Sequence, residues 1–116
     1  MNESKVNKTI ESLVKRTRSG SIQWERVNSQ SLRNPFVQDV VDTTEVDFVN
    51  SFRCEFKDGS IYVLSDFFSS TVFIQPRKDA ALTALPVEKG KISQLKNIIK
   101  DDIDSVDDFL DELNED

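Results

Sequence analysis

An Asp58-Gly59 pair between two runs of β-branched and aromatic residues constrains this chain more than any other feature. The runs occupy residues 52–56 and 61–64, and such a pair between them predicts a β-hairpin. A two-residue type I′ loop requires positive φ at both central positions, which Asp tolerates and Gly adopts without strain. The pair therefore predicts an antiparallel hairpin at the centre of the fold.

The predicted loop decides which side chains oppose one another across the hairpin. It places Phe56 opposite Ile61 and Cys54 opposite Val63, so these apolar side chains share one face. A three-residue loop with a glycine bulge would instead place Phe56 opposite Ser60, which mixes apolar with polar side chains. We therefore expect the two-residue loop.

The two strands of the hairpin differ in the spacing of their apolar residues. The return strand, residues 61–64, is apolar on both faces, which is typical of a central strand covered on both sides. The incoming strand has apolar residues at even positions, which predicts one buried face. These even positions are Val46, Phe48, Phe52, Cys54 and Phe56.

The rest of the chain predicts two helices and further short strands around the hairpin. Residues 4–18 have apolar positions at helical spacing, and a second helical pattern begins at Lys91. Short strands are predicted at residues 21–28, where Trp24 would pack against a helix, and at residues 71–75 and 80–85. Together these elements predict an α+β domain in which N-terminal and C-terminal helices pack on a four- or five-stranded antiparallel meander.

Two segments allow more than one conformation. Asn34 followed by proline suits the start of a short helix in residues 29–44. Such a helix would place on one face Phe36, Val37, Val40 and Val41. The same segment also suits an irregular loop or an edge strand. The C-terminal helix either runs unbroken to Leu113 or breaks near Asp101.

Charge divides the chain into two parts. Its 15 basic and 21 acidic residues give a net charge of −6 at pH 7. Residues 101–116 contain nine of the acids and no base, so residues 1–100 carry a net charge of +3. We therefore expect a single domain over residues 1–100 and an acidic, amphipathic helical extension over residues 101–116.

The residue types needed for most catalytic and metal sites are missing from this chain. It has no histidine and a single cysteine, Cys54, which lies on the predicted core face without a base to activate it. This excludes histidine-dependent nucleophilic sites and a disulfide within the chain, and it leaves no zinc site. We expect no enzyme, metal or cofactor. The remaining catalytic alternative is a carboxylate-dependent hydrolase that would use Asp47, Glu55 or Asp66.

The acidic balance disfavours nucleic acid and anionic membranes as partners, because both repel a net anion. No run of about 18 apolar residues is present that could span a bilayer. The N-terminal segment is amphipathic, unlike the apolar stretch of a secretory signal. These features favour a cytoplasmic protein.

A short motif resembles one found in many small bacterial proteins of unassigned function. It reads Thr17-x-x-Gly20-x-Ile22-x-Trp24 and follows the N-terminal helix. The resemblance implies antiparallel strands after the motif and a closing helix, which agrees with the predicted order over residues 10–100. It implies no activity, and the acidic residues after Lys100 depart from the pattern.

An apolar stripe in the acidic extension is the candidate site. Its members recur at helical spacing and are Ile103, Val106, Phe109, Leu110 and Leu113. The stripe either docks on the protein's own sheet, which we expect first, or belongs to a disordered terminus, or binds a basic groove on another protein or on a second copy.

Composition and the stripe together favour a non-enzymatic protein-interaction module: an adaptor, a chaperone-like protein or an immunity-type protein, with a protein partner or a homodimer. The alternative function is a small-ligand-binding domain. Its pocket would lie between the sheet and the helices, near Trp24, Tyr62 and Phe68.

Overall fold

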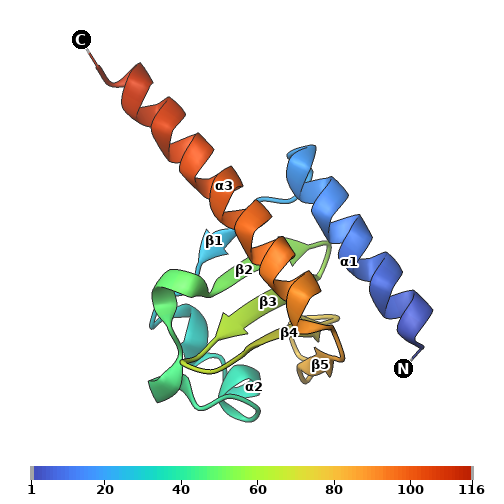
Figure 1. Ribbon diagram of the computed structural model, residues 1–116. Coiled ribbons are helices and arrows are strands. Elements are labelled where there is room, and N and C mark those ends of the chain that lie inside the picture. The colour runs from blue at the N-terminus through green and yellow to red at the C-terminus, as the bar shows by residue number, and fades with distance from the viewer. Residues whose placement is uncertain (1, 116) are drawn as a thin grey trace.

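A computed structural model describes residues 2–115 as a five-stranded antiparallel sheet (Figure 1). One long helix precedes the sheet in the chain and another follows it. The strands lie side by side in chain order, β1-β2-β3-β4-β5, without a crossover. This is the predicted α+β meander, with five strands. The long helices and the strands are α1 (Glu3–Arg18), β1 (Glu25–Arg26), β2 (Phe52–Phe56), β3 (Gly59–Ser65), β4 (Ser70–Gln75), β5 (Thr83–Leu85) and α3 (Lys89–Leu113).

Helix α1 covers the predicted residues 4–18, begins one residue earlier at Glu3, and is capped at both ends. The side chain of Asn2 accepts a hydrogen bond from the Ser4 backbone N–H at 2.8 Å, which satisfies one of the free donors of the first turn. Gly20, just beyond the helix, has φ 77°, a conformation that glycine adopts without strain. The indole N–H of Trp24 donates to the Thr17 hydroxyl at 2.8 Å. This bond fixes the return of the chain beneath the helix, as expected for a Trp packed on a helix.

Helices α1 and α3 cover one face of the sheet together (Figure 1). Val6, Ile10 and Leu13 of α1 pack with Ile92, Leu95 and Ile99 of α3 over the sheet. The sheet contributes Phe52, Cys54, Ile61, Val63, Val72 and Leu85 to the same core, beside Ile22 and Trp24. Burial of these side chains is the largest stabilising contribution available to a domain of this size.

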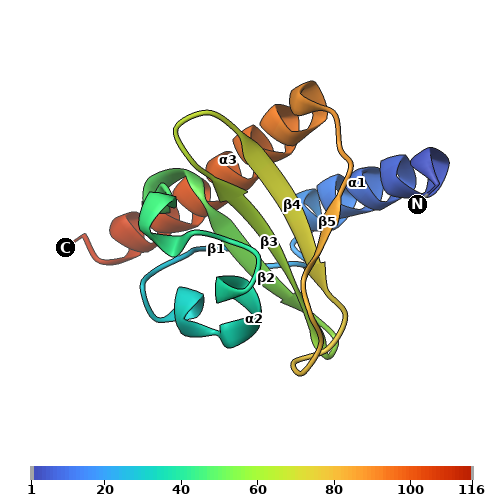
Figure 2. The same cartoon turned by 90° about the horizontal axis from the view of Figure 1, so that it is seen from below.

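The opposite face of the sheet is covered by the connection between β1 and β2 (Figure 2). This connection includes the 3-10 helix η1 (Ser31–Arg33) and the short helix α2 (Pro35–Gln38). The Asn34 side chain caps α2 by accepting from the Phe36 N–H at 3.0 Å, so the short-helix alternative is correct. Val37 is fully buried here, but Val40 lies beyond the helix and is 46% exposed, so the expected four-residue apolar face is wrong.

Strand β3 is buried on both faces, as its sequence predicts, because the two cores lie on either side of it. Ile61 and Val63 face the helices, whereas Tyr62 and Leu64 face the connection between β1 and β2.

The register of the hairpin differs from the predicted one. Phe56 opposes Gly59 and Cys54 opposes Ile61, so the loop consists of Lys57 and Asp58. Neither predicted register is correct, although the shift of two residues keeps every side chain on its expected face. Positive φ falls on Lys57, at 55°, and Gly59 is a strand residue instead.

The predicted strand upstream of Phe52 is also wrong. Two 3-10 helices, η2 (Thr43–Glu45) and η3 (Phe48–Asn50), occupy this segment. Asp42 and Asp47 cap them by accepting hydrogen bonds from backbone N–H groups. Consequently Val46 packs against the other core, on the face away from the helices, and Phe48 is 42% exposed.

Two other strands are shorter than predicted. Only two residues of the segment 21–28 pair with β2, and only three of the segment 80–85 pair with β4. Helix α3, by contrast, is one unbroken helix of 25 residues, which resolves the second open alternative.

Candidate functional site

The C-terminal part of α3 projects beyond the sheet (Figure 1). A helix of 25 residues is about 37 Å long, longer than the sheet it crosses. Ile103 still packs against the core, and Arg26 of β1 lies 3.7 Å from the Asp104 carboxylate. We call residues 104–113, which begin at this last attachment, the α3 extension.

Four members of the predicted stripe are exposed on the α3 extension. The exposed fractions are 53% for Val106, 60% for Phe109, 48% for Leu110 and 64% for Leu113. The expectation that the stripe docks on the protein's own sheet is therefore wrong, except for Ile103. The same apolar face that packs on the sheet through Ile92, Leu95 and Ile99 continues into solvent without a break.

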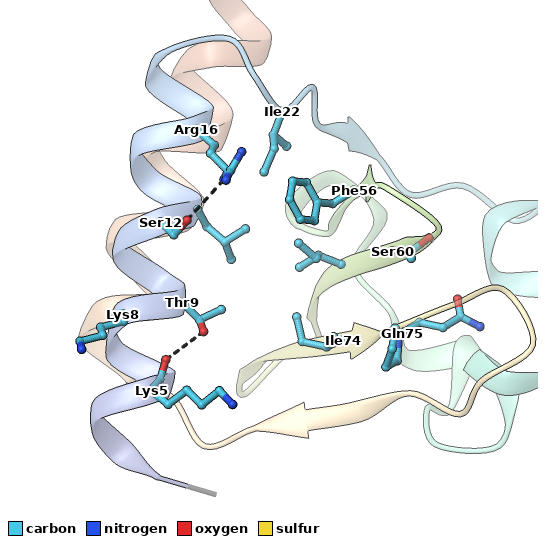
Figure 3. A pocket seen from close by; sticks show the side chains of 14 residues that line it. Lys5, Lys8, Thr9, Ser12, Arg16, Ile22, Phe56, Ser60, Ile74 and Gln75 are labelled. Atoms are coloured by element: carbon cyan, nitrogen blue, oxygen red, sulfur yellow. Dashed lines mark hydrogen bonds between the residues drawn. The ribbon is translucent and has the colours of Figure 1, made fainter.

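An open pocket lies between α1 and the hairpin end of the sheet (Figure 3). We call it the α1 groove, and its volume is about 390 Å³. Leu13, Ile61 and Ile74 belong to its apolar lining, and Lys5, Lys8 and Arg16 are the cations that line it. No acidic residue among those described lines the groove. The combination suits an anionic group attached to an apolar body.

The position of the groove follows from helical periodicity. Lys5, Thr9, Ser12 and Arg16 form one row along α1, beside the row that packs on the sheet. The Thr9 hydroxyl donates to the Lys5 carbonyl at 2.9 Å, and the Arg16 guanidinium donates to the Ser12 hydroxyl at 3.4 Å (Figure 3). Sequence reasoning did not identify this groove, although the spacing of this row was a visible signal.

Phe56 forms the edge of the α1 groove at the end of β2. The Arg16 guanidinium lies 4.9 Å from the centre of its ring, and the Lys57 ammonium lies 5.5 Å from it. Both cations are attracted by the ring quadrupole. Phe56 is 36% exposed, so the groove presents an aromatic surface with positive charge around it.

The three residues expected to form a ligand pocket do not meet. Trp24 lies in the core beneath the helices, and Tyr62 lies in the core on the other face of the sheet. Phe68 is in the turn between β3 and β4 and is 93% exposed. The expected pocket is therefore wrong, and the α1 groove, which does lie between a helix and the sheet, is lined by none of these three residues.

The turn between β3 and β4 carries a second exposed apolar feature. Phe67 and Phe68 are 97% and 93% exposed. The Asp66 carboxylate accepts from the backbone N–H groups of Phe68 and Ser69, both at 2.8 Å, and these bonds lower its pKa. The turn lies beside α3, where the Lys96 ammonium donates to the Ser70 hydroxyl at 3.1 Å. Partial burial is the main cause that lowers the pKa of Lys96.

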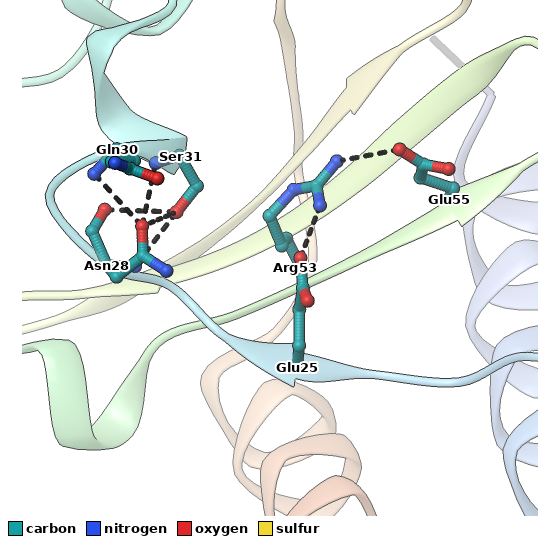
Figure 4. A network of polar contacts seen from close by, with 6 residues as sticks. All are labelled: Glu25, Asn28, Gln30, Ser31, Arg53 and Glu55. Atoms are coloured by element: carbon teal, nitrogen blue, oxygen red, sulfur yellow. Dashed lines mark hydrogen bonds and ion pairs between the residues drawn. The ribbon is translucent and has the colours of Figure 1, made fainter.

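Arg53 joins the sheet edge through a small polar network (Figure 4). Its guanidinium pairs with Glu25 on β1 and with Glu55 at 3.4 Å, and it lies 5.7 Å from the centre of the Tyr62 ring. Nearby, the Asn28 side chain accepts from the backbone N–H of Ser31 at 2.9 Å and so holds the turn before η1. The ion pair between Arg53 and Glu25 thus holds β1 against β2.

The candidate catalytic carboxylates do not form one site. Asp47 and Asp66 line a hollow beside η3, where each caps a turn. Glu55 lies on β2 and pairs with Arg53. Cys54 is buried, and burial raises the pKa of its thiol to about 12, so the thiol stays protonated near neutral pH.

A comparison of the chain with protein-family models, with characterised proteins and with solved structures found no match. The resemblance drawn from Thr17, Gly20, Ile22 and Trp24 therefore stays a prediction. Within residues 2–115, none of the helices combines the length and the apolar character that crossing a membrane requires.

Proposed function

We propose that this protein is a non-enzymatic interaction module that recognises a basic protein surface through the α3 extension. The supporting observation is the exposure of Val106, Phe109, Leu110 and Leu113 on the continuation of a helix whose preceding turns pack in the core. Contiguous apolar side chains exposed in this way mark interaction sites. An adaptor, a chaperone-like protein or an immunity-type protein of the bacterial cytoplasm would use such a surface.

The acids around the stripe set the chemistry of the partner. Residues 101–116 carry nine acids and no base, so a matching groove has an apolar floor and a rim of Lys or Arg. An amphipathic helix lying in such a groove is a common recognition mode, and opposite charges raise the association rate. Salt is therefore expected to weaken the complex.

The experiment is affinity capture from cells that contain the natural partner, with the intact chain as bait. The test variant is Phe109→Gln/Leu110→Gln, which keeps good helix formers at two exposed positions. The control is Ser105→Gln, which lies off the stripe on the same helix. Surface changes of this kind alter the free energy of unfolding by about 0.5 kcal/mol or less, so folding is preserved.

We expect the intact chain and Ser105→Gln to retain the same basic protein, and Phe109→Gln/Leu110→Gln to lose it. Retention of identical proteins by all three baits, with unchanged thermal melting, would count against the proposal. Truncation at Lys100 is a poorer test, because it also removes Ile103, which packs against the core.

A second candidate function is the binding of a small anionic amphiphile, and the α1 groove favours it. The groove has the volume of a ligand site, an apolar lining and three cations. Decanoate is a suitable probe, and decanol is its uncharged control. A rise in melting temperature with decanoate that Arg16→Gln abolishes would support this function, whereas no rise with either compound would contradict it.

A further inference from the structure

The α3 extension and the α1 groove have opposite charge. The extension itself, residues 104–113, carries five acids and no base, and four more acids flank it within residues 101–116. Lys5, Lys8 and Arg16 line the groove, and no acid among the described residues does so. Each surface also carries exposed apolar side chains. The chain therefore contains both halves of a complementary pair.

Their dimensions agree as well. Lys5 and Arg16 stand eleven positions apart on α1, so the groove extends along about 16 Å of helix at about 1.5 Å per residue. The stripe from Val106 to Leu113 spans seven positions, or about 10 Å. A helix carrying the stripe can therefore lie within the length of the groove.

Apolar side chains on the stripe have a matching surface in the groove. The ring of Phe56, which is 36% exposed, and the partly buried side chain of Ile74 line its sheet side, with the buried Ile61 behind them. Insertion of Phe109 and Leu110 against these side chains would remove apolar area from water on both partners. The carboxylates that flank the stripe would then face the cations of α1.

The extension cannot reach the groove of its own molecule. It continues α3 as one unbroken helix, and its end diverges from α1 (Figure 1). The groove lies on the side of α1 that faces the hairpin, as Figure 3 shows. Pairing of two extensions with each other is disfavoured, because both carry only negative charge and like charges on facing helices repel.

We propose that the α3 extension of one copy docks in the α1 groove of a second copy. The inference rests on the proposed function and names a second copy of this chain as the partner. The contact joins two different surfaces, so it forms a reciprocal dimer, a ring, or an open chain of copies where the rotation does not close. The cationic rim and acidic helix make this assembly weaker at high salt.

The experiment measures mass in solution by light scattering during gel filtration, for loading concentrations from about 10 µM to 1 mM, which spans affinities of weak interfaces. The extension variant is Phe109→Gln/Leu110→Gln. The groove variant is Lys8→Glu/Arg16→Glu, which reverses two exposed charges on α1. The matched control, Arg33→Glu/Lys78→Glu, reverses two exposed charges outside the groove.

We expect the intact chain and the control to form the same oligomer. Each test variant alone should have a dissociation constant raised more than about thirtyfold, as for truncated hot-spot side chains, and should run as a monomer. An equimolar mixture of the two test variants should recover a 1:1 complex. In it, the intact extension of the groove variant meets the intact groove of the extension variant.

A monomeric intact chain at every concentration would overturn the inference, as would an oligomer that both variants leave unchanged or a mixture that stays monomeric. The same variants distinguish failure of this inference from failure of the proposed function. If the intact chain is monomeric and Phe109→Gln/Leu110→Gln still loses a foreign basic partner, the self-docking inference fails and the proposed function stands.

Discussion

Replacement of Gly59 is the most direct test of the hairpin register. A Cβ at this position would lie 2.8 Å from the Pro76 carbonyl oxygen and closer still to the carbonyl oxygen of Gln75. Real Cβ atoms essentially never come within 3.0 Å of a heavy atom outside their own and the adjacent residues, and both obstacles here belong to the backbone. Alanine therefore forces the end of β4 away from β3.

The cost follows from the kind of atoms that collide. Overpacking typically lowers the free energy of unfolding by about 1–3 kcal/mol, and a backbone obstacle cannot rotate away, so we expect about 3 kcal/mol for Gly59→Ala. A chain of this size loses about 4 °C in melting temperature per kcal/mol, which predicts a fall of about 12 °C. Thermal and urea unfolding followed by circular dichroism measure both quantities.

Two further variants separate this explanation from a turn glycine. Asn accepts positive φ, so Gly59→Asn would be tolerated if Gly59 were a type I′ loop residue. In this structure φ at Gly59 is not positive, and Asn brings the same Cβ as Ala. The melting temperatures of both variants should therefore fall by the same amount. Gly90→Ala is the control: a Cβ meets no atom within 4 Å, and higher helix propensity should add about 0.5 kcal/mol. A Gly59→Asn protein that melts like the intact chain would refute the reasoning.

The remaining predictions concern single side chains. Lys57 has a positive φ of 55°, which is strained for lysine, so Lys57→Gly should add about 0.5 kcal/mol to the free energy of unfolding in urea. A lower free energy of unfolding would show that the backbone at Lys57 is not strained. Thr17→Val removes the acceptor of a buried indole N–H and should cost about 1–3 kcal/mol in the same assay, whereas no change would count against that bond. The thiol of Cys54 should react with a maleimide only after unfolding, even at pH 9, because burial raises its pKa to about 12; rapid native labelling would contradict this. The backbone N–H of Phe68 is the main cause that lowers the pKa of Asp66 below 3.8. Its stabilising effect should be present above about pH 4 and be lost as pH falls through the folded pKa, which an NMR titration measures; an unshifted titration would exclude it.

Much of the fold could be predicted because the deciding signals are local. The alternation around Cys54 and the double-sided apolar run of β3 depend on neighbouring residues alone. The register could not be predicted, because the need for glycine at position 59 comes from Gln75 and Pro76 in another strand. A turn rule assigned the glycine to the loop, whereas a tertiary contact requires it in the strand.

The segment before β2 shows a different limit. Val46 and Phe48 match a strand pattern, but Asp42 and Asp47 are good caps for 3-10 turns and redirect the chain. The combination of Asp42 with Glu45 three positions later was a visible helix-start signal.

The candidate site was predicted in part. The stripe from Ile103 to Leu113 follows from helical spacing, but its exposure depends on where the sheet ends beneath α3. That edge is set by β1, which has only two residues. No pattern within the helix itself contains this information.

The meander without crossovers also implies an order of assembly. Strands β2 to β5 each pair with the next strand across a short loop, which favours rapid folding, whereas β1 joins β2 across the long connection of residues 27–51. The packing of α1 against α3 has the greatest separation in sequence, because it joins the first and the last of the described elements. During synthesis the sheet can therefore form while half of its helical cover is missing. The face that receives Ile92, Leu95 and Ile99 stays open until the last helix leaves the ribosome, and that interval is when the nascent chain is most exposed to aggregation.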